Sequence, residues 1–195
     1  MLRRFARDRA PALLAAVAAV TAIAPFRHLV VPGGHTMSVA MTNCGALGWV
    51  SDTRGYRYEP DDPVTGLPWP AMPAAFAELA DAAAEAGGFA PFAPEACLIN
   101  RYVPGAKLSL HVDRDERSKL VPIVSVSLCL PAIFLWGGLG RTDPTLKVRV
   151  EHGDVVVFGG PSRHVFHGVA ALPGGTHSTT GTARINLTFR RARPF

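Results

Sequence analysis

A chain of 195 residues fits one domain of ordinary size and can bury a hydrophobic core without disulfides. With 48% hydrophobic and 18% charged residues, its composition excludes an intrinsically disordered protein. The formal net charge of +5 suits a polyanionic partner, although many basic proteins bind none. Three widely spaced cysteines, none in a Cys-x-x-Cys pair, indicate reduced thiols and therefore the cytoplasm.

The N-terminal segment has two interpretations. Several arginines precede the apolar run from Ala12 to Ala24, which is the order found in a secretory signal. The run is too short to span a bilayer. The same residues place Leu13, Val17 and Val20 at helical spacing, which predicts a helix packed on a soluble core. These residues alone leave both interpretations open.

The next segments predict a strand, a long loop and a second helix. Residues from Thr36 to Thr42 alternate in polarity, as in a strand. From Asn43 to Pro73 we find no periodicity and many turn residues, so irregular backbone is expected, and so long a loop usually serves a function. Apolar residues at helical spacing then predict a helix that starts at Pro73 and ends before Gly87.

The rest of the chain reads as short strands separated by turns, which predicts a jelly roll or barrel. The expected strands are Cys97–Val103, Lys107–Val112, Ile123–Leu130, Ala132–Trp136, Leu146–Glu151, Asp154–Phe158, His164–Val169 and Thr182–Arg190.

Two histidines and an aspartate form the candidate metal site. His111 and Asp113 are two residues apart, so they share one face of a strand. His167 lies in a later strand, which a jelly roll can bring alongside. Two imidazoles and one carboxylate are typical of non-haem Fe(II) oxygenases. Taken alone, the pattern is more often a chance occurrence of surface or hydrogen-bonded histidines.

The last strand carries polar residues at alternate positions, and they suit an acidic cosubstrate because guanidinium groups pair with carboxylates. A strand with its polar face in water is the ordinary alternative. The strand from Cys97 to Val103 adds an amide and a phenol. The residues concerned are Arg184, Asn186, Thr188 and Arg190, with Asn100 and Tyr102.

At this point the chain resembles the AlkB-type Fe(II)- and 2-oxoglutarate-dependent dioxygenases, over nearly its whole length. The segments that carry the resemblance are Pro32-Gly33-Gly34 with Thr36–Gly45, Pro68–Pro73, Leu98–Tyr102, Pro104–His111, Pro122–Leu128, Glu151–Val157, His111-x-Asp113 with His167, and Arg184-x-Asn186-x-Thr188-x-Arg190.

The resemblance implies an α+β, mainly β fold: a double-stranded β-helix, or jelly roll, with two N-terminal helices and a nucleotide-recognition lid. Residues 1–95 would form the helices and lid, packed within one structural domain on a catalytic core of residues 96–195. It also implies that the N-terminal stretch is a folded helix of a cytoplasmic protein. We expect no membrane association, and no obligate protein partner is evident from the sequence.

By the same resemblance, His111, Asp113 and His167 bind Fe(II), and the 2-oxoglutarate residues are Asn100, Tyr102, Arg184, Asn186 and Arg190. We expect Arg184 at the distal carboxylate and Arg190 nearer the metal. The methylated base would lie between Trp49 and His111, with Asp115 accepting a hydrogen bond from its exocyclic amine. Tyr56, Arg57, Tyr58 and Arg141 would line the nucleotide site.

The implied reaction is the oxidative demethylation of 1-methyladenine and 3-methylcytosine in single-stranded or flipped-base DNA, or RNA, in alkylation repair. It would consume 2-oxoglutarate and O2 and give succinate, CO2 and formaldehyde. Val112 and Val31 depart from the family pattern, at positions where the family has polar residues. The remaining histidines show no partner pattern and are expected to be structural or exposed: His28, His35, His152, His164 and His177.

Two other functions fit the same residues. The first is an Fe(II)/2-oxoglutarate hydroxylase of a small molecule or a protein, for which Trp49 would be dispensable. The second is a non-catalytic, basic nucleic-acid-binding domain with a structural metal. In that case an Asp113→Ala variant would keep its metal content. Binding of that kind should weaken steeply with salt.

Overall fold

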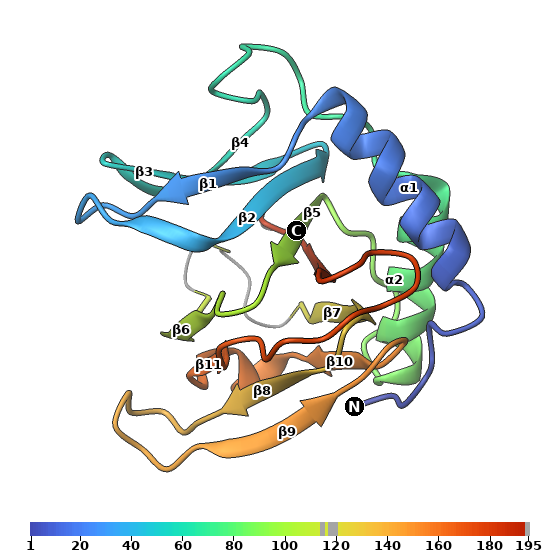
Figure 1. Cartoon of the computed structure of the whole chain (residues 1–195), viewed down its shortest axis with the longest axis vertical. Helices are drawn as coiled ribbons and strands as arrows, with labels where there is room; N and C mark the ends of the chain where they lie inside the picture. The colour runs from blue at the N-terminus through green and yellow to red at the C-terminus, as the bar shows by residue number, and fades with distance from the viewer. Residues whose placement is uncertain (114–115, 117–120, 194–195) are drawn as a thin grey trace.

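The computed structural model describes residues 1–113, 116 and 121–193. Within them the chain forms two α-helices, twelve strands and one 3-10 helix (Figure 1). In chain order these are α1 (Ala10–Ile23), β1 (Arg27–Val30), β2 (Thr36–Gly45), β3 (Gly48–Asp52), β4 (Gly55–Glu59), α2 (Ala74–Ala86), β5 (Ala96–Tyr102), β6 (Leu108–His111), β7 (Ile123–Cys129), β8 (Ala132–Trp136), β9 (Leu146–Val150), β10 (Val155–Phe158), η1 (Gly160–His164), β11 (His167–Val169) and β12 (Arg184–Arg190).

Two antiparallel sheets form the jelly roll that the sequence predicts. The major sheet has the order β1-β2-β5-β12-β7-β10, and the minor sheet has the order β6-β11-β8-β9. Helices α1 and α2 lie together on one side of the molecule (Figure 1), where their apolar faces pack on the major sheet. β1 and β2 extend the major sheet beyond β5, so residues ahead of position 96 share a sheet with the core.

The central strand β12 separates two environments. Ile185, Leu187 and Phe189 point to the helices and belong to the buried cluster that includes Phe76 of α2. The rings of Phe76 and Phe189 meet edge to face, with their centroids 5.8 Å apart. Because side chains alternate along a strand, the polar residues of β12 point the other way, into a cavity between the two sheets.

The N-terminal helix packs as the soluble-helix interpretation predicts. Leu13, Val17 and Val20 of α1 are buried in the same cluster as Phe76. Their burial confirms the helical spacing read from the sequence. In the part of the chain that the structure describes, no helix is both long enough and apolar enough to cross a membrane.

The prediction of irregular backbone from Asn43 to Pro73 holds for residues 60–73, which lie outside the helices and strands, but it was wrong for most of residues 43–59. β2 continues to Gly45, and residues 48–59 form the β3–β4 hairpin, in which Trp49 pairs with Tyr58 and Ser51 with Tyr56. Gly55 has φ +127°, which a glycine adopts without strain at the start of the second strand. The hairpin escapes a hydrophobic-period search because aromatic and charged side chains alternate along β4 in place of apolar and polar ones.

Two other strand predictions also need correction. His164, where the sequence predicts a strand to begin, is the last residue of the 3-10 helix η1, and β11 starts only at His167. Pro161 near the start of η1 and Gly160 at φ +56° favour a turn of helix over a strand. β1 was not predicted, because four residues at the edge of a sheet are too few to establish an alternation.

Candidate active site

The three candidate metal ligands converge. One ligand atom from each of His111, Asp113 and His167 lies within 4.8 Å of the others. Nε2 of His111 is 3.7 Å from one Asp113 oxygen, and Nε2 of His167 is 3.7 Å from the other. The two histidines face each other because β6 and β11 are neighbours in the minor sheet, with His111 paired to His167. Asp113 follows directly after β6.

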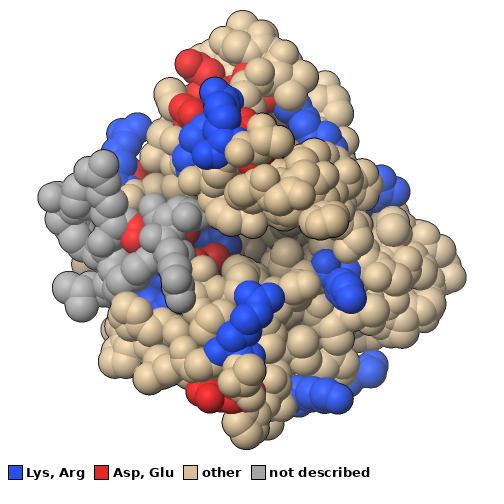
Figure 2. All heavy atoms as spheres, turned by 90° about the vertical axis from the view of Figure 1, so that its left-hand side faces the viewer, with Lys and Arg blue, Asp and Glu red and all other residues tan. Residues whose placement is uncertain are grey.

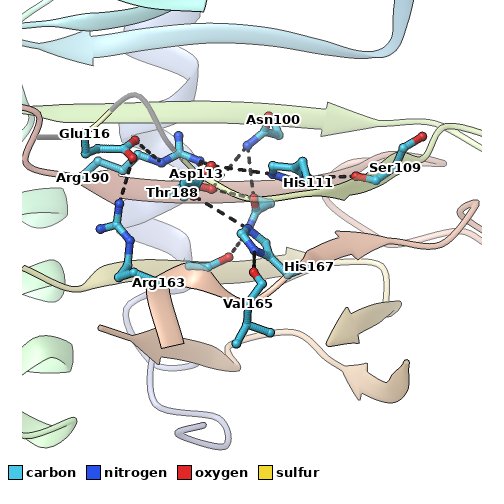
Figure 3. Close-up of polar contacts among 12 residues, drawn as sticks. Asn100, Ser109, His111, Asp113, Glu116, Arg163, Val165, His167, Thr188 and Arg190 are labelled. Atoms are coloured by element: carbon cyan, nitrogen blue, oxygen red, sulfur yellow. Dashed lines mark hydrogen bonds and ion pairs between the residues drawn. The ribbon is translucent and has the colours of Figure 1, made fainter. Parts of the chain in front are cut away.

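Hydrogen bonds orient both imidazoles for metal binding. Nδ1 of His111 lies 2.9 Å from the carbonyl oxygen of Ser109, and Nδ1 of His167 lies 3.2 Å from that of Val165 (Figure 3). A carbonyl oxygen only accepts, so each ring donates from Nδ1 and keeps a lone pair on Nε2. Both lone pairs are thus on the nitrogens that approach Asp113, as a metal site requires.

Burial sets the protonation of this site. The buried environment lowers the pKa of His167 to about 4, although the Asp113 carboxylate acts in the opposite direction. Burial would raise the pKa of Asp113, but the charges of Arg190, His167 and His111 outweigh it and hold that pKa well below its usual value. Near neutral pH the site therefore offers a neutral His167 and an ionised Asp113, which are the forms that bind metals.

A second group of polar side chains lines the cavity beside the metal ligands. Arg184 is fully buried, donates from Nη2 to Ser127 Oγ at 3.1 Å, and stacks its guanidinium carbon 4.9 Å from the Tyr102 ring centroid. Burial lowers the pKa of Arg184. Arg190 at the other end donates from Nη2 to both oxygens of Asp113 at 3.2 Å. Arg190 therefore marks the end of the cavity near the metal ligands, and Arg184 marks the distal end.

Unsatisfied polar atoms show that this cavity fits an acidic ligand. Arg184 Nε, Arg184 Nη1 and Asn100 Oδ1 are buried without a hydrogen-bond partner among the described residues. Buried donors without partners are rare in folded proteins and call for an explanation. A carboxylate placed against Arg184 would satisfy its free N–H groups, so the side chains fit a dicarboxylate such as the expected 2-oxoglutarate.

Asparagines hold the middle of the cavity wall. Asn186 donates from Nδ2 to Ser125 Oγ and to the Val126 carbonyl, both at 2.9 Å, and accepts from Asn100 at 3.2 Å. Thr188 Oγ lies 3.0 Å from the Asn186 oxygen. This network fixes the amide orientations between the two arginines.

The β3–β4 hairpin presents the candidate base-binding aromatics. The rings of Trp49 and Tyr56 are stacked, with centroids 5.5 Å apart and planes 14° apart. Asn43 anchors the strand, because its amide oxygen accepts from the Trp49 backbone N–H at 3.0 Å and its Nδ2 donates to the Trp49 carbonyl at 2.9 Å. Burial raises the pKa of Tyr58 well above its ordinary value, so its hydroxyl remains a donor.

Of the other expected nucleotide residues, the structure places Arg57 away from that aromatic face. Arg57 lies between Tyr56 and Tyr58 in β4, so it occupies the opposite face, where its guanidinium binds Asp52 and Glu59. Arg141 is exposed in the connection between β8 and β9. Asp115 lies outside the described residues.

Sequence reasoning missed two buried charged residues near the metal ligands. Glu116 and Arg163 are 2% and 1% exposed, and Arg163 Nη2 donates to Glu116 Oε2 at 2.8 Å. Both come from segments without a periodic pattern, so no signal in the sequence points to them. The cavity serines could have been found, because Ser125 and Ser127 alternate within the predicted strand from Ile123.

His152 and His177, which show no partner pattern in the sequence, lie together beside Cys129 in the structure. His152 Nδ1 accepts from the Cys129 backbone N–H at 2.9 Å, and His177 Nδ1 accepts from that of Thr179 at 3.2 Å. Each neutral ring therefore carries its proton on Nε2, the reverse of His111 and His167. This hydrogen bonding favours a structural role for the cluster over metal binding.

The face of the molecule shown in Figure 2 is hollowed. Figure 2 shows a depression between the upper part of the molecule and the lower part, with Lys and Arg side chains scattered around it. Such a surface suits a ligand that carries negative charge.

Comparisons with known proteins agree with this geometry. The family model of the 2OG-Fe(II) oxygenase superfamily matches residues 1–190. The chain is 57% identical over 192 residues to the alpha-ketoglutarate-dependent dioxygenase AlkB of Escherichia coli (strain K12), covering 98% of this chain and 89% of that protein. It is 32% identical over 174 residues to the DNA N(6)-methyladenine demethylase ALKBH1C of Arabidopsis thaliana, covering 76% of this chain and 38% of that protein. The solved structure of OsALKBH1 has a TM-score of 0.83 and 28% identity, covering 97% of this chain and 96% of that one.

Proposed function

This chain belongs to the 2OG-Fe(II) oxygenase superfamily as an AlkB-type Fe(II)- and 2-oxoglutarate-dependent dioxygenase, and from that premise we propose that it demethylates alkylated bases in DNA. The substrates we propose are 1-methyladenine and 3-methylcytosine in single-stranded or flipped-base DNA, with RNA as a further substrate. The reaction converts the N-methylated base, 2-oxoglutarate and O2 into the unmodified base, formaldehyde, succinate and CO2. We place it in the cytoplasm, because Cys44, Cys97 and Cys129 are free thiols.

One observation carries the proposal: two Nε2 lone pairs and an ionised carboxylate meet beside a buried arginine with free N–H groups. In our assignment His111, Asp113 and His167 hold Fe(II), which supplies the oxidising chemistry when it is bound with 2-oxoglutarate and O2. Arg184 receives the distal carboxylate, while Arg190 lies nearer the metal. Asn100, Tyr102 and Asn186 shape the wall between them.

The remaining residues select and hold the base. A methylated base that pairs poorly is easier to extrude from a duplex, and the Trp49 ring offers a face for it to stack on. We keep Tyr56, Tyr58, Asp115, Arg57 and Arg141 as proposed nucleotide residues. Arg57 would act indirectly, because it cross-links the hairpin through Asp52 and Glu59.

The division of labour follows the chain. We propose that residues 1–95 supply the helices and the nucleotide-recognition hairpin, and that residues 96–195 supply the catalytic core. Both parts belong to one domain, because β2 and β5 pair within the major sheet.

The test is a coupled measurement of both products. The protein is incubated with Fe(II), 2-oxoglutarate and a single-stranded oligonucleotide that contains one 1-methyladenine, in air. We expect one succinate for each adenine restored, measured by mass spectrometry. Asp113→Ala should abolish both products, whereas Asp8→Ala, an exposed control, should not. Failure of the wild type to restore adenine would reject the proposal.

A second variant separates the proposal from a hydroxylase of another substrate. Trp49→Ala should slow repair of the oligonucleotide while the protein still binds Mn(II) and 2-oxoglutarate. Succinate formation that ignores both the oligonucleotide and this substitution would indicate a small molecule or a protein as the substrate.

A further inference from the structure

A buried carboxylate that is not a metal ligand lies at the centre of a charged network beside the metal site. The Glu116 side chain is 2% exposed. Its Oε2 accepts from Arg163 Nη2 at 2.8 Å, and its Oε1 accepts from the Tyr58 hydroxyl at 2.5 Å. The same Oε1 lies 3.4 Å from Arg190 Nε. Figure 3 shows Glu116 between the two arginines.

Arg190 connects this carboxylate with the metal ligand. Its Nη2 is 3.2 Å from both oxygens of Asp113, while its Nε faces Glu116. A cation so close to Asp113 competes with a metal ion for the carboxylate oxygens and also repels the metal. The negative charge of Glu116 offsets that cation from its other side.

Arg163 holds Glu116 in place. Arg163 is itself 1% exposed, and its Nη1 donates to the Val121 carbonyl at 3.0 Å. It lies in η1, four residues before His167 in the chain. Two buried cations and two buried carboxylates thus balance each other, and removal of one charge leaves another uncompensated.

Tyr58 connects the network with the hairpin. Tyr58 pairs across the hairpin with Trp49, so its hydroxyl bond to Glu116 ties the aromatic face to the core. A hydrogen bond to a buried charged group is among the stronger ones in proteins.

From these contacts we propose that Glu116 is a positioning residue with two roles. Its charge partly neutralises Arg190, which weakens the competition of that cation with the metal ion for the Asp113 oxygens. It also anchors the β3–β4 hairpin through Tyr58. The second role rests on the proposed function, because there the hairpin binds the base. Glu116 need not touch the metal or the cosubstrate for either role.

The first test is metal affinity without nucleic acid. In E116Q the charge of Arg190 is no longer offset from that side, and the dissociation constant for Mn(II) should rise about tenfold. Free Mn(II) is measured by electron paramagnetic resonance on metal-stripped protein, with E78Q on the exposed face of α2 as the matched control. An unchanged constant in folded E116Q overturns the proposal. Absence of Mn(II) binding in the wild type would instead reject the proposed function.

The second test uses a pair of hydroxyl deletions in the same hairpin. Y58F keeps its ring but loses the bond to Glu116, so the KM for the 1-methyladenine oligonucleotide should rise about tenfold with little change in kcat. T53V removes the hydroxyl of an exposed residue in the turn between β3 and β4, so it is the matched control and should behave as the wild type. Equal KM values for Y58F and T53V overturn the anchoring role. This pair decides the matter alone if E116Q does not fold.

Discussion

The free energy of unfolding of the metal-free protein should fall steeply between pH 7 and pH 5, because the buried His167 ring resists protonation in the folded protein. The His167 side chain is 7% exposed, and burial lowers its pKa to about 4. In the unfolded chain the same ring has a pKa of about 6.5. Below that value the unfolded chain therefore binds a proton that the folded protein excludes.

The sign and size follow from linkage. Stability rises with pH wherever the unfolded state binds more protons. The stability is therefore complete above about pH 7 and is lost as the pH falls from there to the folded pKa, about 4. Over that whole window the loss is roughly 3 kcal/mol, of which about 2 kcal/mol is lost by pH 5.

The assay is urea unfolding of metal-stripped protein at pH 7, 6 and 5. The glutamine of His167→Gln cannot be protonated. Between pH 7 and pH 5 the free energy of unfolding of this variant should therefore fall by about 2 kcal/mol less than that of the wild type. His35→Gln removes an exposed ring and should keep the wild-type dependence. Parallel curves for the wild type and His167→Gln would refute the role of burial at this site.

Three further predictions concern the core, the metal site and the cosubstrate wall. Leu187→Ala should lower the free energy of unfolding by about 3 kcal/mol in urea, because Leu187 is fully buried between the helices and the sheet. Gly168→Ala should raise the Mn(II) dissociation constant about tenfold, because a Cβ would lie 2.6 Å from the backbone oxygen of Leu108 in β6. Gly174→Ala is the control, because a Cβ there would meet no atom within 4 Å. Equal dissociation constants for the two variants would contradict the packing argument. Arg184→Lys should weaken 2-oxoglutarate binding to the Mn(II) protein about tenfold in calorimetry, since lysine lacks the planar pair of donors, and unchanged affinity would place the distal carboxylate elsewhere.

Much of the fold could be predicted because its signals are local. The apolar spacing of Leu13, Val17 and Val20 marks a helix whatever surrounds it, and the alternation along β12 marks a strand with one polar face. The hairpin of Trp49 and Tyr56 could not be found in this way, because its strands pair through cross-strand aromatic contacts and do not alternate apolar with polar residues.

The candidate site also contains residues that could be predicted from the sequence and residues that could not. The histidines, Asp113 and the two arginines could be proposed from their residue types and spacing, since each lies on or next to a regular strand. Glu116 and Arg163 could not, because each is a charged residue in an irregular segment, and such residues are usually solvated. Their burial becomes evident only when each is seen to neutralise the other.

By itself, the sequence determined which side chains are available, which strands and helices most of them occupy, and which face of β12 is polar, because these depend on neighbours along the chain. Only the tertiary structure decided that His111 pairs with His167, that Arg190 contacts Asp113 and Glu116 at once, and that backbone N–H groups occupy Nδ1 of His152 and His177. Those facts depend on strand pairing and on which hydrogen bonds the backbone leaves to each ring. Contacts between residues more than fifty positions apart are set by packing, which no local pattern encodes.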